Sequence, residues 1–267
     1  MARLALSSWA VHGWVGQSFE YLPGQPAATG ALDRILGLPA RAKAAGITTL
    51  EVCDFHLLPD RGEIERLKVA AEASGVNLFQ LLIDHGDITH PSEAEASLAY
   101  IESWIQVAAW GGFERVRVIA GQQPPSAQTI DQSVNGLVRL KARGDVLGVN
   151  VSTENWQALT ASPEVVAEIL ERSGIGLVFD FGNWPGPDKY ERLGKIAKFA
   201  TSCHAKCDFA DGKPLLEDFE TCLLIVREAG FDGNLTLVHP EPPDEWAALT
   251  PQIEAVRRTF WAASTMA

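Results

Sequence analysis

The chain is short of positive charge and of cysteine. Lys and Arg number 22 against 34 Asp and Glu, and no run of basic residues offsets the net charge of −12. Such a chain repels a polyanion, which argues against binding nucleic acid. The four cysteines are too few for the disulfide framework of a small secreted domain. We therefore expect reduced thiols, with Cys203 and Cys207 on a buried strand rather than paired on a metal.

Long apolar runs are also missing. No apolar stretch approaches the roughly 20 residues needed to cross a bilayer, and the N-terminus has neither the apolar core nor the cleavage site of a signal peptide. The first apolar stretch is not followed by the GxGxxG pattern of a dinucleotide-binding sheet. These absences predict a cytoplasmic protein that binds no membrane, and they disfavour an open, doubly wound sheet.

What the chain does contain is eight short apolar and β-branched stretches, which begin at residues 3, 48, 77, 115, 148, 176, 201 and 234. Their starts lie roughly 25 to 45 residues apart, which leaves room for one strand, one helix and two loops. Helical periodicity fills the intervals, and several of these segments end on glycine, as at Gly75 and Gly174. We predict an α/β protein with a single (β/α)₈ TIM barrel over residues 1–267.

Polar side chains collect where the predicted strands end. Barrel enzymes build their sites from the carboxyl ends of the strands, so these groups should meet on one rim. They comprise all six histidines, at 12, 56, 85, 90, 204 and 239, and the acids at 51, 54, 84, 87, 154 and 180.

Three of these residues interrupt apolar strands: Glu154, Asp180 and His204. A buried carboxylate is costly unless a cation or hydrogen bonds compensate it. Mixed oxygen and nitrogen donors suit Mn²⁺, Mg²⁺, Co²⁺ or Zn²⁺, so we predict a divalent metal site. The alternatives are an ion pair of Glu154 with Arg117 or Lys206, a loop-capping Asp180, and a core histidine at 204.

The chain resembles the xylose isomerase-like TIM-barrel superfamily, which includes sugar phosphate isomerases and epimerases. The resemblance rests on the order and spacing of LLIDHGDITHP, VRVIAG, GVNVSTEN, LVFDFGN, CHAKCDF and AGFDGNLTLVHPEPPDEW. It implies that Glu154, Asp180 and His204 are metal ligands on strands five, six and seven. It also implies that Lys206 lies beside the substrate or the metal-bound oxygen. His85 and Arg117 would face the substrate, unless they are a solvated loop histidine and a structural arginine.

Strand eight departs from the pattern of this superfamily. Where relatives usually have a glutamate that is both fourth ligand and proton shuttle, this chain has Val238. Glu241 could replace it by folding back after Pro240, or His239 could ligate if a bulge shifted the alternation of side chains. Alternatively three protein ligands hold the ion, with water or substrate filling the remainder, or the metal has been lost. We favour three firm protein ligands, with Glu241 slightly ahead of His239 as an auxiliary. Trp156 is a second departure, because relatives commonly have histidine there.

The resemblance implies a small carbohydrate substrate and an enediolate intermediate, because a divalent ion that binds a carbonyl and its neighbouring hydroxyl lowers the cost of forming one. We expect an isomerase or epimerase in which Glu154 transfers protons together with Glu241, His239 or Lys206. A lyase or dehydratase acting on a keto-sugar, keto-inositol or 3-keto-glycoside is the alternative. A sugar-binding barrel without catalysis, and the DNA-repair endonuclease branch, are weaker alternatives.

Substrate contacts are also predicted for His56, His239 and the aromatic face of Trp156, which could stack on sugar C–H groups. Trp9, Trp14 and Trp184 fall near the same rim. The apolar TFWAA stretch near the C-terminus would suit the contact of a homo-oligomer.

Overall fold

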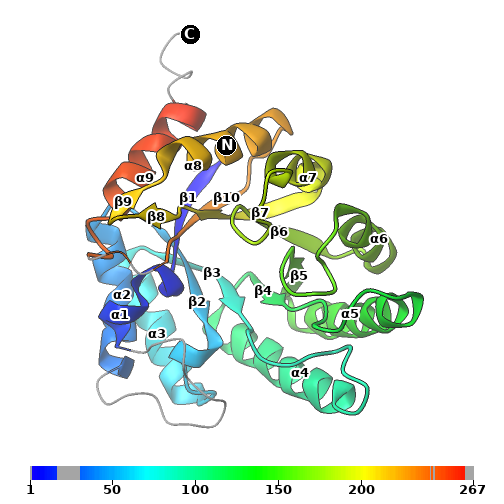
Figure 1. Cartoon of the computed structure of the whole chain (residues 1–267). Helices are drawn as coiled ribbons and strands as arrows, with labels where there is room; N and C mark the ends of the chain where they lie inside the picture. The colour runs from blue at the N-terminus through cyan, green and yellow to red at the C-terminus, as the bar shows by residue number, and fades with distance from the viewer. Residues whose placement is uncertain (1, 17–30, 241, 243, 262–267) are drawn as a thin grey trace.

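The computed structural model describes residues 2–16, 31–240, 242 and 244–261, and within them it confirms the predicted TIM barrel. Eight parallel strands form a closed ring in the order β1-β10-β7-β6-β5-β4-β3-β2, and helices surround them (Figure 1). The eight are β1 Arg3–Ser7, β2 Thr49–Cys53, β3 Asn77–Leu82, β4 Arg115–Val118, β5 Asn150–Glu154, β6 Gly176–Asp180, β7 Ala200–Lys206 and β10 Asn234–Val238.

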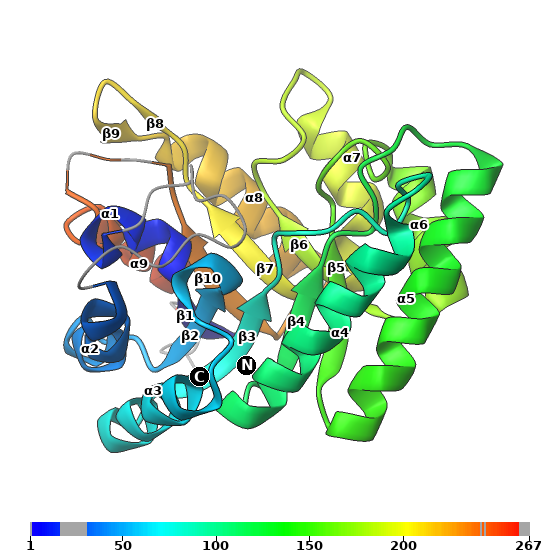
Figure 2. The ribbon, with the colours of Figure 1, turned by 90° about the horizontal axis from the view of Figure 1, so that it is seen from below.

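The helices alternate with the strands, as the sequence predicts (Figure 2). They are α1 His12–Val15, α2 Ala31–Ala44, α3 Arg61–Ser74, α4 Ala94–Gly111, α5 Ala127–Leu147, α6 Pro163–Ser173, α7 Lys189–Ile196, α8 Leu216–Glu228 and α9 Leu249–Val256, with short 3₁₀ turns at Ser8–Val11, Asp54–His56 and Ala197–Phe199 and a π-helical turn at Arg257–Trp261. A small antiparallel hairpin, β8 Phe209–Ala210 and β9 Lys213–Pro214, follows β7 and was not predicted.

Helix α6 shows how residues at its two ends determine where the helix begins and stops. The side chain of Ser162 accepts a hydrogen bond from the backbone N–H of Val165, and Pro163 takes the first helical position, where no N–H is required. The helix ends at Gly174, whose φ of +67° is the left-handed conformation that glycine adopts without steric cost.

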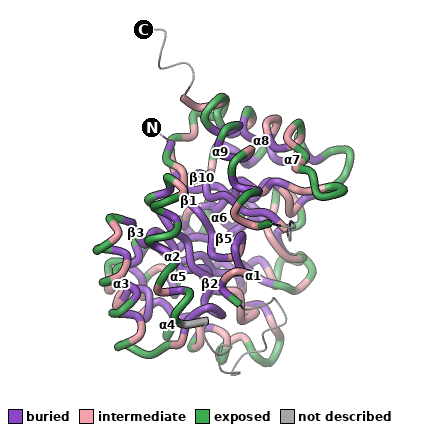
Figure 3. The backbone as a smooth tube through the Cα atoms, turned by 90° about the vertical axis from the view of Figure 1, so that its left-hand side faces the viewer, coloured by how far each residue is buried: buried purple, intermediate pink, exposed green. Residues whose placement is uncertain are grey.

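The strands are buried on both faces, because side chains that point outward pack under the helices and side chains that point inward fill the barrel. Figure 3 shows most of the barrel strands in the colour of buried residues. The outward set is apolar, as with Leu177 and Leu235. The inward set is unusually polar for a barrel interior and includes Glu51, Gln80 and Thr236, each fully buried. The interior is therefore a network of hydrogen bonds as well as a packed core.

The register of the ring places two of the predicted ligands, Asp180 and His204, side by side. Asp180 on β6 pairs with His204 on β7, and His204 pairs with Thr236 on β10. Paired residues in parallel strands face the same side of the sheet. Glu154 ends the adjacent strand β5, so three consecutive strands deliver the three side chains to the inside of the barrel.

The four cysteines are free and buried, as expected. Cys203 lies within β7, whereas Cys207 directly follows the end of this strand instead of lying on it. Among the described residues, no helix is both long and apolar enough to span a membrane.

Candidate functional site

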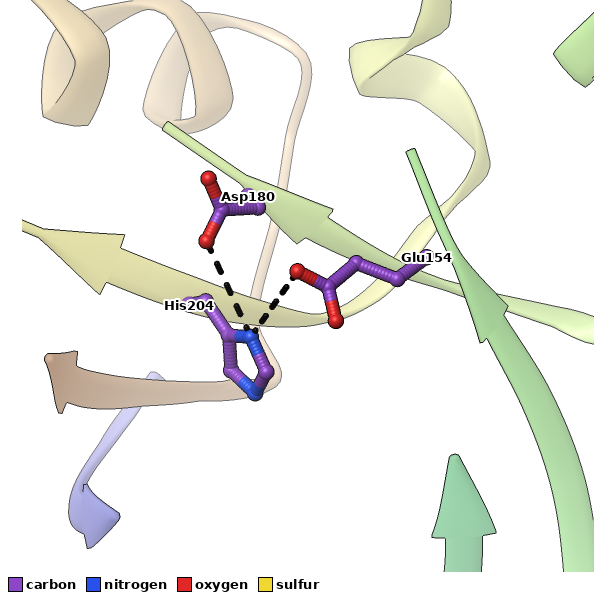
Figure 4. A group of neighbouring side chains, drawn as sticks. All are labelled: Glu154, Asp180 and His204. Carbon is purple, nitrogen blue, oxygen red and sulfur yellow. Dashed lines mark ion pairs between the residues drawn. The ribbon is translucent and has the colours of Figure 1, made fainter. Parts of the chain in front are cut away.

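Glu154, Asp180 and His204 converge inside the barrel (Figure 4). The Nδ1 atom of His204 lies 3.3 Å from Oε1 of Glu154 and 3.8 Å from Oδ2 of Asp180. One donor atom from each residue lies within 4.8 Å of the other two, and all three side chains are buried. The carboxylates and the imidazole thus surround one point.

A divalent ion fits this donor set. Carboxylate oxygens and an imidazole nitrogen bind such ions at about 2.1 Å, so two donors of one ion are at most about 4.2 Å apart. The side chains need only small movements to reach that spacing. Two carboxylates and a neutral imidazole suit Mg²⁺, Mn²⁺, Co²⁺ or Zn²⁺.

Asp180 is held in place by an interlocking turn. Its Oδ1 accepts hydrogen bonds from the backbone N–H groups of Gly182 and Asn183, at 2.6 and 2.7 Å, which leaves Oδ2 to face His204. The side chain of Asn155 bonds both the N–H and the C=O of Asp180. Burial and the neighbouring charge of Glu154 raise the pKa of Asp180 to about 6.

Glu154 uses both of its oxygens. Oε1 accepts a hydrogen bond from Nδ2 of Asn183 at 2.7 Å and faces His204, while Oε2 lies 3.0 Å from Nε of Arg117. Burial alone would raise the pKa of Glu154, but His204 and Arg117 outweigh it and lower the pKa to about 2. Glu154 therefore makes the ion pair with Arg117 that the sequence offered as an alternative, and it faces the candidate metal position as well.

His204 is fixed from behind by Glu51. The Nε2 atom of His204 lies 2.8 Å from Oε2 of Glu51, and the hydroxyl of Thr236 donates to Oε1 of Glu51 at 2.6 Å. Burial alone would lower the pKa of His204, but the carboxylates of Glu154 and Glu51 raise it to about 10. The negative field that holds a proton on this ring is also the field that would attract a cation.

These side chains open into a pocket of about 210 Å³, which is small compared with the roughly 300–1,000 Å³ of sites for drug-sized ligands. The described residues that line it are Ser7, Trp9, Cys53, Leu82, Asp84, Arg117, Glu154, Trp156, Asp180, Asn183, His204, Lys206 and Val238. The lining combines charged groups with the two indole rings of Trp9 and Trp156.

Arg117 and Trp156 form part of one wall. The guanidinium carbon of Arg117 lies 5.2 Å from the centre of the Trp156 ring, and Nη2 of Arg117 lies 2.6 Å from Oδ1 of Asp84. Arg117 is thus placed between Asp84 and Glu154 and stacked on an aromatic face.

Lys206 extends across Gly182 into the pocket. A Cβ atom added to Gly182 would come within 2.6 Å of Cδ of Lys206, so glycine leaves the room that the lysine stem occupies. Among the described residues we find no hydrogen-bond or ion-pair partner of the Lys206 ammonium, which leaves it available to a ligand.

The other predicted site residues lie elsewhere. His56 contacts Ser8 and Phe55, and His239 bonds Gln252 of α9, so neither is among the described residues that line the pocket. His85 is likewise outside this lining and bonds Asp54. Glu241 lies outside the described residues.

Strand β10 shows why His239 faces away. The strand pairs in regular register up to Leu237 against β1 and up to Val238 against β7, without a bulge in its described residues. Val238 lines the pocket, and the next side chain therefore points to the outside of the barrel. Three protein donors, with Val238 in the fourth place, are what the described residues bring together.

Several residues of the site were missed from sequence. The sequence predicts Glu51 at the rim, whereas it lies within β2 beneath His204. Asn155 directly follows Glu154 and Asn183 lies three residues after Asp180, and amides at those places are the available signal. The sequence predicts Asp84 at a strand end without indicating a role for it, and the structure places it in the lining of the pocket.

The chain was compared with curated proteins, with solved structures and with models of protein families. None of the curated proteins matches the chain. Solved structures that resemble it include an L-ribulose 3-epimerase, at 18% identity and a TM-score of 0.76, covering 100% of this chain and 98% of that one. A xylose isomerase-like TIM barrel protein from Mycobacterium smegmatis in complex with magnesium has 14% identity and a TM-score of 0.69, covering 100% and 97% of the two chains.

A third structure, the apo form of 3-keto-D-glucoside 4-epimerase from E. coli, has 13% identity and a TM-score of 0.68, covering 97% of this chain and 100% of that one. At these identities the likeness shows the fold alone. The model of one family, the xylose isomerase-like TIM barrel, matches residues 39–253. This match spans most of the chain, and the protein therefore belongs to the xylose isomerase-like TIM-barrel family.

Proposed function

We propose that the protein is a divalent-metal-dependent isomerase or epimerase that acts on a small keto-sugar or keto-polyol through an enediolate. The observation that carries the proposal is the convergence of Glu154, Asp180 and His204 in a small, charged pocket. The magnesium complex of one structurally similar protein and the epimerase activities named for others support it.

The substrate class follows from the lining. Arg117 and Lys206 are the Lys and Arg side chains among the described residues of the lining, and Arg117 is already shared between Asp84 and Glu154. A phosphate group would need more positive charge than Lys206 alone supplies. We therefore propose an unphosphorylated substrate, with Trp9 and Trp156 facing its C–H groups.

The residues divide the work as follows. Glu154, Asp180 and His204 would hold the ion, which when bound polarises a carbonyl and stabilises negative charge on its oxygen. Arg117 keeps Glu154 ionised, and Glu51 presents the Nδ1 side of His204 to the site. Lys206 is available to stabilise, or to donate a proton to, the oxygen that gains charge when the substrate enolises.

A lyase is the second candidate, and Val238 favours it. An apolar side chain at this place leaves one wall without a group that can return a proton to carbon. An enediolate that is not reprotonated can expel a leaving group from the neighbouring carbon. Keto-inositols and 3-keto-glycosides would be the substrates.

Metal content tests the centre directly. The protein as purified and after dialysis against Mn²⁺ should contain one ion per chain, and Glu154→Ala and Asp180→Ala should lose most of it. Glu93→Gln, an exposed carboxyl at the start of α4, is the control and should keep it. Unchanged occupancy in both site variants would remove the centre from the proposal.

A substrate panel then tests the reaction. Ketoses and 3-keto-glycosides are incubated with the Mn²⁺-loaded protein in D₂O. Deuterium in isomers of otherwise unchanged composition supports the isomerase, and loss of water or aglycone supports the lyase. Binding without turnover, and without any effect of EDTA, would support a sugar-binding barrel and contradict both.

A further inference from the structure

The proposed reaction requires a base that reaches a carbon-bound proton, and Glu154 is poorly placed for this. Its Oε1 is bonded to Asn183 and faces the candidate metal position, and its Oε2 is paired with Arg117. Both oxygens therefore already contact a cation or a hydrogen-bond donor, whereas a base needs an oxygen that is free to reach the carbon-bound proton. The place of the strand-eight carboxylate holds Val238, which cannot serve either.

Asp84 is the remaining carboxylate among the described residues that line the pocket. It lies two residues beyond the end of β3, and its side chain is 13% exposed. Oδ1 is paired with Arg117 at 2.6 Å, whereas among the described residues we find no hydrogen-bond partner for Oδ2. One oxygen is thus anchored and the other is available.

The ring order places Asp84 across the pocket from the ammonium of Lys206. Strands β3 and β7 are four places apart in a ring of eight and are therefore opposite each other. Asp84 follows the first and Lys206 ends the second, and both line the same pocket. A ligand bound between them presents one face to a carboxylate and the other to a cation.

The surroundings of Asp84 hold it in this position. Its backbone N–H donates to Oδ1 of Asp54 at 3.4 Å, and Asp54 is itself buried and bonded to His85 and Tyr100. Burial, together with the charges of Asp54 and Glu154, raises the pKa of Asp84 against the opposing effect of Arg117. A carboxyl with a raised pKa is a better proton acceptor than an ordinary one.

We propose that Asp84 is the acid–base residue that removes the carbon-bound proton next to the substrate carbonyl, an assignment that rests on the proposed function. The C–H electron pair forms the C=C bond of the enediolate, the carbonyl pair moves onto oxygen, and the proton goes to Oδ2 of Asp84. In the reverse direction Asp84 returns a proton to the same carbon and the carbonyl is restored. In D₂O the proton on Asp84 is replaced by a deuteron, so the carbon becomes labelled.

The test compares wild type, Asp84→Asn, Asp84→Glu and the exposed control Glu93→Gln, all loaded with Mn²⁺. Solvent deuterium entering the recovered ketose or 3-keto-glycoside is followed by mass spectrometry, and the Kd for Mn²⁺ is measured by titration calorimetry. Asp84→Asn should slow labelling by about 100-fold or more with an unchanged Kd for Mn²⁺. Asp84→Glu should recover part of the rate, and Glu93→Gln all of it.

Other outcomes overturn the assignment in distinguishable ways. Full labelling by Asp84→Asn would overturn the role of Asp84 and leave the proposed function intact. A raised KM with an unchanged kcat would make Asp84 a group that only binds a substrate hydroxyl, and this too would overturn the acid–base role. A wild-type protein that labels no compound of the panel would overturn the proposed function, and the role of Asp84 with it.

Discussion

The imidazole of His204 lies between two sets of carboxylates, with Nε2 at 2.8 Å from Oε2 of Glu51 and Nδ1 turned toward Glu154 and Asp180. A histidine that donates its outer N–H to a carboxylate is fixed in ring orientation and is a stronger donor at its other nitrogen. Glu51 is fully buried and is itself held by Thr236, so this orientation is set before any ion binds.

The first prediction concerns Glu51. Glu51→Gln keeps the shape of the side chain but removes its charge, and it should weaken Mn²⁺ binding by about 10- to 100-fold. Thr236→Val, which removes only the hydrogen bond to Glu51, should have a smaller effect in the same direction. Calorimetric titration of both variants checks this, and an unchanged Kd in Glu51→Gln would show that Glu51 serves the barrel interior alone.

The second prediction concerns Val238. Val238→Glu adds a carboxylate at the inward place of β10, beside the three donors. Without metal the extra buried charge should destabilise the fold by about 1–3 kcal/mol, and with Mn²⁺ that loss should be recovered because binding tightens. Urea unfolding with and without Mn²⁺ measures both effects. Val238→Gln, uncharged and of equal size, is the control and should not tighten binding to the same degree.

The third prediction concerns the path of Lys206. Gly182→Ala places a methyl group where the lysine stem now lies, and the flexible stem should move aside at a cost of about 1 kcal/mol or less. Because the ammonium is displaced from the pocket, kcat should fall while the melting temperature changes little. Gly194→Ala meets no neighbouring atom within 4 Å and serves as the control. An unaltered kcat in Gly182→Ala would mean that the position of Lys206 is unimportant.

The fourth prediction concerns pH and His239. Burial lowers the pKa of His239 from its ordinary 6.5 to about 4, so the folded protein keeps this ring neutral while the unfolded chain protonates it. Because protonation then favours the unfolded chain, His239 has no effect on the free energy of unfolding above pH 6.5 and lowers it progressively as the pH falls toward 4. At pH 5 the loss from this residue is about 2 kcal/mol.

His239→Gln removes that contribution. Its free energy of unfolding should fall less between pH 7.5 and pH 5 than that of wild type, by about 2 kcal/mol. Urea unfolding at the two pH values gives the comparison. An equal fall in both proteins would show that other groups carry the acid sensitivity.

The barrel could be predicted because each of its β/α units has a recognisable pattern in a short stretch of sequence. Each strand is a short apolar run, and helices such as α6 carry their own start and stop residues, as at Ser162 and Gly174. The hairpin of β8 and β9 could not be predicted, since strands of two residues have no periodicity to detect.

The ligand trio could be proposed because a charged group within an apolar strand is costly and needs a partner. The partners themselves depend on register between distant strands. Glu51 meets His204 across 153 residues of sequence, and only the closure of the ring defines that contact. The same holds for Asp84, whose importance follows from the position of β3 opposite β7.

The three candidate donors lie on β5, β6 and β7, which are neighbouring strands in the barrel. An ion bound there would link three adjacent strands at their carboxyl ends. Its positive charge would also offset the mutual repulsion of the acidic side chains around it. Occupancy at 100 times the Kd would add about 2.7 kcal/mol to the unfolding free energy. A simple heating curve would then rank candidate cations before any sugar has been identified.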